Sequence, residues 1–303
     1  MDKQFMIDEI NRLRKEKNVV ILAHYYQYPE IQDIADFVGD SLLLSRKAAE
    51  TDADIILFCG VHFMAETAKI LSPNKKVLLP DLNAGCPMAD CATEAALLKY
   101  KEKHPDTKVV CYVNSTASIK ALSHVCVTST NAKKIAKTLV GEKLLYVPDH
   151  NLGNYLNKQI PGLNMDLWPG HCCIHNDLFP GDVIALKQKY PNAKFIVHPE
   201  ANEEVVGMGD FVGSTQQLLN FTAEDSCQEF IVGTEKGILH KMQEKSPEKN
   251  FHILTEDLRC RTMKMITLEK VYQAIKDDQF EIHVDEDIAK KANQALVRML
   301  ELS

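Results

Sequence analysis

The stretch VVILAHYYQ (residues 19–27) has the same order of apolar and polar residues as two later stretches, VVCYVNSTA (residues 109–117) and FIVHPEANE (residues 195–203). Each stretch begins with a run of apolar residues, many of them β-branched, which is the pattern of a buried strand, and each ends in polar side chains. Their recurrence at similar intervals along a chain of 303 residues predicts structural units of one kind.

The polar ends of these three strands can be aligned on His24, Asn114 and His198, which are separated by 90 and 84 residues. In an open parallel α/β sheet, ligands bind beyond the carboxyl ends of the strands. Units that face one another would therefore direct these ends toward a shared centre. The polar residues just past predicted strand ends are His24, Tyr26, Tyr112, Asn114, Ser129, His198, Glu200 and Thr234.

Two further sets of strand-like runs follow the first. The second set is DIILFCGVH, HVCVTST and EFIVGTE, at residues 54–62, 124–130 and 229–235. The third set is KVLLPDL, KLLYVPD and FHILTED, at residues 76–82, 143–149 and 251–257. Helical patterns separate the strands, and this order is typical of βαβ units with parallel sheets.

We therefore predict an α/β fold of three similar α/β/α, Rossmann-like units in a pseudo-threefold arrangement around a central site. The units are expected at residues 1–86, 87–172 and 173–303, and the third carries an additional C-terminal helical segment. The alternative is one large doubly wound sheet, which would use the same alternation of strands and helices.

Composition excludes several classes of function. Apolar residues make up 45% of the chain and charged residues 25%, which is ordinary for a globular protein. The formal net charge of -7 argues against non-specific binding to nucleic acid or to an anionic membrane. The amphipathic residues 1–18 do not resemble a signal or transit peptide, and no apolar run reaches the length of a membrane span. We expect a cytoplasmic protein.

Three of the nine cysteines keep the interval of the repeat. Cys86, Cys172 and Cys260 are separated by 86 and 88 residues. One thiolate from each unit could hold one iron–sulfur cluster, and because such clusters normally take four ligands, three would leave one iron open as a Lewis acid. The alternative is that each is a small buried apolar residue. Spacing alone does not choose between Cys172 and its neighbour Cys173.

Six segments in order along nearly the whole chain resemble the motifs of the quinolinate synthase family. The segments are ILAHYYQYPEIQDIADFVGDSL, LLPDLNAGCPMAD, CYVNSTASIKA, WPGHCCIH, VHPEAN and CRTMKMITLEKVYQAI. The fourth resembles the family's Trp-x-Gly-x-Cys motif, which selects Cys172 over Cys173. Two departures are visible: Tyr25 stands where Asn is frequent, and Cys260 stands alone where some members have a CxxCxxC arrangement.

The resemblance implies a transferase of NAD biosynthesis. Such an enzyme condenses iminoaspartate with dihydroxyacetone phosphate to give quinolinate, phosphate and water. It also implies one non-redox 4Fe–4S cluster per chain, held by Cys86, Cys172 and Cys260. The expected functional partner is L-aspartate oxidase or aspartate dehydrogenase, which would supply iminoaspartate.

Roles can then be assigned to the strand-end residues. Glu200 is the predicted general acid/base, and His198 shares its strand face by the period of two. His24 and Tyr26 are likewise two residues apart, and they would supply a hydrogen-bond donor and a weak acid to the substrate ketone. The predicted substrate-binding residues are His24, Ser41, Tyr112, Asn114, Ser129, His198, Glu200 and Thr215. The alternatives are a strand-end ion pair for Glu200 and helix N-caps for the Ser and Thr residues.

Two other functions remain open from the sequence. An iron–sulfur hydro-lyase that acts on a small hydroxy acid would use the same open iron. A non-catalytic ligand-binding protein of repeated α/β lobes would need no metal.

Overall fold

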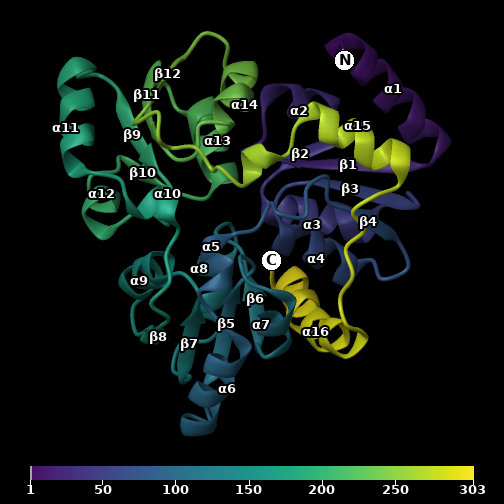
Figure 1. Cartoon of the computed structure of the whole chain (residues 1–303). Coiled ribbons are helices and arrows are strands. Elements are labelled where there is room, and N and C mark those ends of the chain that lie inside the picture. The colour runs from purple at the N-terminus through teal and green to yellow at the C-terminus, as the bar shows by residue number, and fades with distance from the viewer. Residues whose placement is uncertain (1) are drawn as a thin grey trace.

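Three separate parallel sheets of four strands carry the fold in the computed structural model, which describes residues 2–303 (Figure 1). The first sheet has the order β2 (Phe37–Gly39), β1 (Val19–His24), β3 (Ile55–Cys59) and β4 (Lys76–Leu78). The second has the order β6 (Val125–Val127), β5 (Lys108–Tyr112), β7 (Leu144–Val147) and β8 (Met165–Leu167). The third has the order β10 (Phe211–Val212), β9 (Lys194–Val197), β11 (Glu229–Gly233) and β12 (Asn250–Ile253). The prediction of three similar α/β units is confirmed, and the alternative of one large sheet is wrong.

All three sheets repeat one strand register. The strands β1, β5 and β9 come first in their sheets along the chain and are called the central strands. A residue of a central strand pairs with the residue 15 positions later on one side and with the residue 36 positions later on the other. The equivalent sets are Leu22 with Phe37 and Phe58, Val110 with Val125 and Tyr146, and Ile196 with Phe211 and Val232. The fourth strand follows its partner by 21 positions in each sheet: Leu57 with Leu78, Tyr146 with Leu167, and Ile231 with His252.

This register corrects the alignment drawn from sequence. Counting forward from Leu22, Val110 and Ile196, the structural equivalents are His24, Tyr112 and His198, so Asn114 does not correspond to the two histidines. Asn114 is instead the equivalent of Tyr26 and Glu200. The later strands of the second unit are also assigned to the wrong sets. The run at residues 124–130 is β6, an edge strand equivalent to β2 and β10, and the run at residues 143–149 is β7, the equivalent of β3 and β11. The strands β2, β8 and β10 were missed, since two or three residues are too few to display a period.

Helices connect the strands in the same order in each unit. The crossover helices of the first unit are α2 (Pro29–Ile34), α3 (Ser41–Glu50) and α4 (His62–Leu71). Those of the second are α7 (Ala117–Ala121), α8 (Ala132–Lys137) and α9 (His150–Gln159). Those of the third are α12 (Glu203–Gly207), α13 (Thr215–Glu224) and α14 (Ile238–Lys245). Before the central strands lie α1 (Lys3–Glu16), α6 (Glu94–Lys103) and α11 (Pro180–Lys189). The predicted amphipathic N-terminal helix is thus confirmed as α1.

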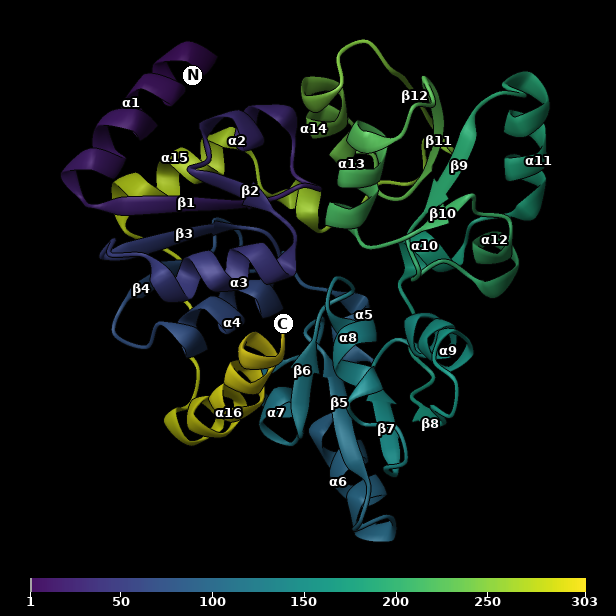
Figure 2. The same cartoon turned by 180° about the vertical axis from the view of Figure 1, so that it is seen from behind.

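The C-terminal segment does not stay with the third sheet. Helix α15 (Leu268–Asp277) packs on α1, and the strand-like residues after it bond to the free edge of β4, where the Ile282 N–H donates to the Val77 carbonyl at 2.8 Å. Helix α16 (Glu286–Leu302) lies against α4, α7 and β6, between the first and second units (Figure 2). The end of the chain therefore joins two units that precede it in sequence. No helix within residues 2–303 is both long enough and apolar enough to span a bilayer.

We predict that α16 contributes to the shared core of the first two units. Leu296 is fully buried, so Leu296→Ala should lower the free energy of unfolding by about 2–5 kcal/mol. The neighbouring Val297 is 37% exposed, and Val297→Ala should change that free energy by less than about 0.5 kcal/mol. Urea unfolding followed by circular dichroism measures both. Equal, small effects of the two substitutions would contradict the packing.

Candidate active site

A single cavity is lined by every catalytic, substrate-binding and cluster-ligand residue predicted from the sequence. Its wall includes His24, Tyr26, Ser41, Cys86, Tyr112, Asn114, Ser129, Cys172, His198, Glu200, Thr215 and Cys260. Thr234, the remaining strand-end residue, is fully buried behind the wall and contacts the Tyr26 hydroxyl at 2.8 Å. The chain thus brings all predicted residues together, although the chemical role of each stays a prediction.

Strand register explains why these residues meet. His24, Tyr112 and His198 occupy one equivalent position after the central strands, and Tyr26, Asn114 and Glu200 occupy the position two residues later. Side chains two residues apart along an extended strand point to the same side, so each unit presents a pair of groups to the cavity.

Ser41, Ser129 and Thr215 form a third equivalent set, just after the edge strands. The helix-capping interpretation is wrong for Ser41 and Thr215, because their neighbours cap α3 and α13. Asp40 accepts from the Leu43 N–H at 2.9 Å, and Ser214 forms a capping box with Gln217. The hydroxyls of Ser41 and Thr215 are therefore left on the cavity wall.

Each of the three cysteines follows the fourth strand of its sheet. Cys86 and Cys172 are the N-caps of the short helices α5 (Pro87–Asp90) and α10 (Cys173–Asn176), and Cys260 precedes the 3₁₀ turn η1 (Met263–Met265). Each thiol faces the backbone N–H groups two and three residues further on. Cys172 follows β8, the equivalent of β4 and β12, which at three residues is too short to be recognised from the sequence.

Burial raises the pKa of the Cys86 thiol to about 12 and also raises the pKa values of Cys172 and Cys260. The backbone N–H groups oppose this effect, since they stabilise a thiolate. A bound metal ion would provide the missing positive charge and deprotonate the thiols outright. Three sulfur donors with N–H partners on one cavity are a donor set that fits an iron–sulfur cluster. Cys173 is exposed and, within residues 2–303, no other cysteine lines this cavity.

Glu200 lies at the centre of a buried hydrogen-bond network. Its Oε1 accepts from the Tyr112 hydroxyl at 2.6 Å, and its Oε2 lies 2.9 Å from Nδ1 of His175 and 3.6 Å from Nδ1 of His198. Burial raises the pKa of Glu200, but His198, His175 and the Tyr112 hydroxyl outweigh it and lower the pKa to about 2. Glu200 is therefore a carboxylate near neutral pH.

Two histidines of the wall, His24 and His198, are neutral bases. Burial lowers the pKa of His24 to about 3 and that of His198 to about 4. Nδ1 of His24 accepts from the Tyr26 N–H at 3.1 Å, which leaves the imidazole proton on Nε2. His24 can thus donate a neutral hydrogen bond to a substrate oxygen.

Sequence reasoning missed His175. Its Nε2 lies 2.9 Å from the Thr234 hydroxyl, and its Nδ1 lies 3.3 Å from the Cys172 thiol. The ligand atoms of Cys172, His175 and Glu200 all lie within 4.8 Å of one another, so this group could hold a metal ion. The available signal was its position three residues after a predicted ligand at the start of a helical turn, where the two side chains share a face.

Comparison with known proteins identifies the family of the chain. The sequence profile of the family described as quinolinate synthetase A protein matches residues 8–301. The chain belongs to the quinolinate synthetase A family. Proteins named quinolinate synthase are 48% identical to it in Caldicellulosiruptor saccharolyticus and 50% identical in Alkaliphilus metalliredigens, and each alignment covers 100% of both chains. The quinolinate synthase of Clostridium perfringens is 46% identical over 97% of this chain and 98% of its own.

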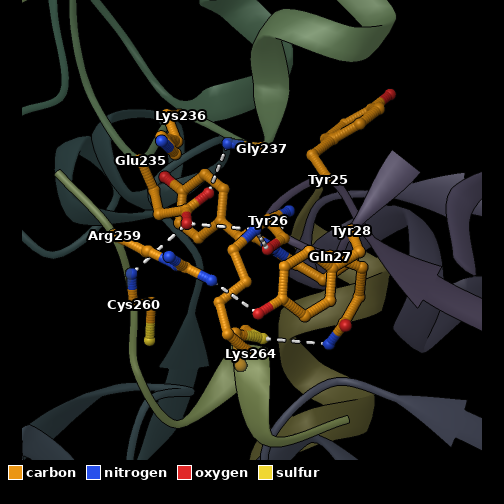
Figure 3. A network of polar contacts seen from close by, with 12 residues as sticks. Tyr25, Tyr26, Gln27, Tyr28, Glu235, Lys236, Gly237, Arg259, Cys260 and Lys264 are labelled. Carbon is orange, nitrogen blue, oxygen red and sulfur yellow. Dashed lines mark hydrogen bonds and ion pairs between the residues drawn. The ribbon is translucent and has the colours of Figure 1, made fainter. Parts of the chain in front are cut away.

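The third cysteine, Cys260, lies beside a buried ion pair that anchors its segment (Figure 3). Glu235 is fully buried, and its Oε1 accepts from the Cys260 N–H at 3.3 Å and lies 3.2 Å from Nζ of Lys264. Lys264 also donates to the carbonyl of Tyr26 at 2.5 Å. The strand register makes Val61 and Asp149 the equivalents of Glu235, so a similar anchor is not repeated in the first unit. The ion pair ties the Cys260 segment to the first and third units.

We predict that this ion pair is required for stability. Burial raises the pKa of Glu235 and lowers that of Lys264, so each charge depends on the other. Lys264→Met leaves an unpaired buried carboxylate and should reduce the free energy of unfolding by about 3–5 kcal/mol. The matched control is Lys236→Met, which breaks an exposed pair with Glu256 and should cost about 0–1 kcal/mol. Similar losses in the two variants, measured by urea unfolding, would contradict the prediction.

Proposed function

We propose that this chain is a quinolinate synthase, which condenses iminoaspartate with dihydroxyacetone phosphate to form quinolinate, phosphate and water in NAD biosynthesis. The observation that carries the proposal is one cavity lined by three equivalent cysteines and by Glu200. Full-length similarity to proteins named quinolinate synthase supports it.

Cys86, Cys172 and Cys260 would hold one 4Fe–4S cluster. The cluster, when bound through three thiolates, would supply a Lewis acid for polarising an oxygen of the substrate. The backbone N–H groups that face each thiol stabilise the thiolate form that ligation requires.

Glu200 would move the protons. Because its lowered pKa keeps it ionised near neutral pH, it starts as a general base and returns the proton as an acid in a later step. Tyr112 and His175 hold its two oxygens in place. Burial raises the pKa of Tyr26 well above its usual range, so its hydroxyl stays protonated and serves as a hydrogen-bond donor.

The remaining wall residues would hold the anionic groups of the substrates. Ser41 and Thr215 lie in the first turns of α3 and α13, whose N-terminal N–H groups favour anions. The predicted partners of substrate carboxylate, phosphate and ketone oxygens are His24, Ser41, Tyr112, Asn114, Ser129, His198 and Thr215.

We also propose that the units divide near residues 86/87 and 172/173, with each ligand cysteine close to the end of a unit or just beyond its last strand. The proposed source of iminoaspartate is L-aspartate oxidase or aspartate dehydrogenase, and the proposed compartment is the cytoplasm.

A direct assay tests the reaction. Anaerobic protein is incubated with dihydroxyacetone phosphate and iminoaspartate, generated from oxaloacetate and ammonia, and quinolinate is measured by mass spectrometry. A hydro-lyase would leave dihydroxyacetone phosphate unchanged, and that result would overturn the proposal.

The three cysteines should be individually essential for the cluster. Cys86→Ala, Cys172→Ala and Cys260→Ala should each abolish the brown colour and the content of about four irons per chain. Cys173→Ala is the matched control, since this thiol is exposed and lies beside the proposed ligand. Loss of iron in Cys173→Ala with retention in Cys172→Ala would show that the ligand assignment is wrong.

Glu200→Gln should lower kcat by about 10²–10⁴-fold, because the amide keeps the shape of the side chain but cannot exchange a proton. Iron content and substrate binding, measured by absorbance and by calorimetry, should remain unchanged. Near-normal turnover would assign the proton transfer to another residue.

A further inference from the structure

Cys172, His175 and Glu200 place three different metal-binding atoms at one point of the cavity wall. Sγ of Cys172 lies 3.3 Å from Nδ1 of His175, Nδ1 lies 2.9 Å from Oε2 of Glu200, and the three ligand atoms all lie within 4.8 Å of one another. In a tetrahedral zinc site the same atoms are about 3.4–3.6 Å apart, from the usual zinc–ligand bond lengths. An ion would fit if Nδ1 of His175 moved a few tenths of an ångström from Sγ of Cys172 and Oε2 of Glu200, and if the sulfur and the carboxylate oxygen came closer together.

The residues around these donors hold them in position. Thr234 contacts Nε2 of His175 at 2.9 Å, so this nitrogen can donate its proton to the hydroxyl while Nδ1 faces the metal. Tyr112 donates to the other oxygen of Glu200 at 2.6 Å. Partners of this kind fix the tautomer and orientation of metal ligands, and their loss commonly lowers metal affinity by about 10–100-fold.

We propose that the cluster-free chain binds one divalent transition-metal ion, zinc above all, through Cys172, His175 and Glu200. Thiolate, imidazole and carboxylate are the ligands that zinc prefers, and the two anionic groups balance its charge. The thiol proton of Cys172 is released to solvent on binding. All three donors line the cavity, which is also the entry path for the ion.

This site shares only Cys172 with the proposed cluster site. A zinc ion on Cys172 therefore excludes the cluster, and zinc should block its reassembly. The inference does not rest on the proposed function, because it concerns donors of the cluster-free chain.

Cobalt binding to the full-length, cluster-free protein tests the site. Co²⁺ reports its ligands optically, and one Co²⁺ per chain should give a thiolate-to-cobalt charge-transfer band that one equivalent of Zn²⁺ removes. His175→Phe and Cys172→Ser should lose this band. Thr234→Val should weaken binding about 10-fold or more, and Thr234→Ser should restore it.

Two cysteine variants provide the matched controls. Cys86→Ser and Cys260→Ser remove proposed cluster ligands but leave the zinc donors, so both should bind Co²⁺ like the unmodified chain. If either loses the band as Cys172→Ser does, the metal sits on the three thiols and the inference is overturned. Normal binding by His175→Phe would overturn it equally.

Alkylation gives a second measurement. Zn²⁺ should protect Cys172 from iodoacetamide while Cys86 and Cys260 react, as read by peptide mass spectrometry. Equal protection of all three, or of none, would reject the site. Circular dichroism of each variant confirms that the protein compared is folded.

Discussion

Parallel strand pairing in one repeated register is the constraint on which the site depends. Side chains alternate along a strand with a period of two, so a shift of one residue would turn a strand's whole set of side chains to the opposite face. The same 15- and 36-residue offsets in all three sheets bring Tyr26, Asn114 and Glu200 to equivalent positions. Three lobes with a common register therefore build a cavity that no single lobe contains.

The sequence predicted the central strands because their apolar runs are covered on both faces and stand out from their surroundings. Edge strands such as β2 and β10 have two or three residues and give no such pattern. The polar residues at the ends of these strands could be predicted as well, because each apolar run marks the point where its strand ends. No strand end marks His175. Its neighbours Thr234 and Glu200 come from a different part of the chain and meet it only after folding, so its spacing from Cys172 is the signal that the sequence offers.

The cavity gathers buried acids, thiols and neutral bases. Burial disfavours every charge there, yet Glu200 remains ionised because hydrogen bonds from Tyr112 and His175 and the electrostatic effect of His198 lower its pKa. The thiols have only backbone N–H groups to offset their burial. A bound cation would supply the positive charge that buried thiolates and a buried carboxylate lack, so this wall is electrostatically suited to a metal ion.

Helix α15, which follows the third sheet in sequence, packs on α1, which precedes the first sheet. Helix α16 completes the core between the first and second units. A ribosome delivers α15 and α16 after all three sheets. Until α15 emerges, the first lobe has an uncovered apolar face, and until residue 260 is made, the third thiol is absent from the cavity. Individual lobes can form as they are made. A site that takes one thiol from each unit, in contrast, cannot be complete until residue 260 has been made, so any metal it binds would enter a chain whose three sheets are already synthesised.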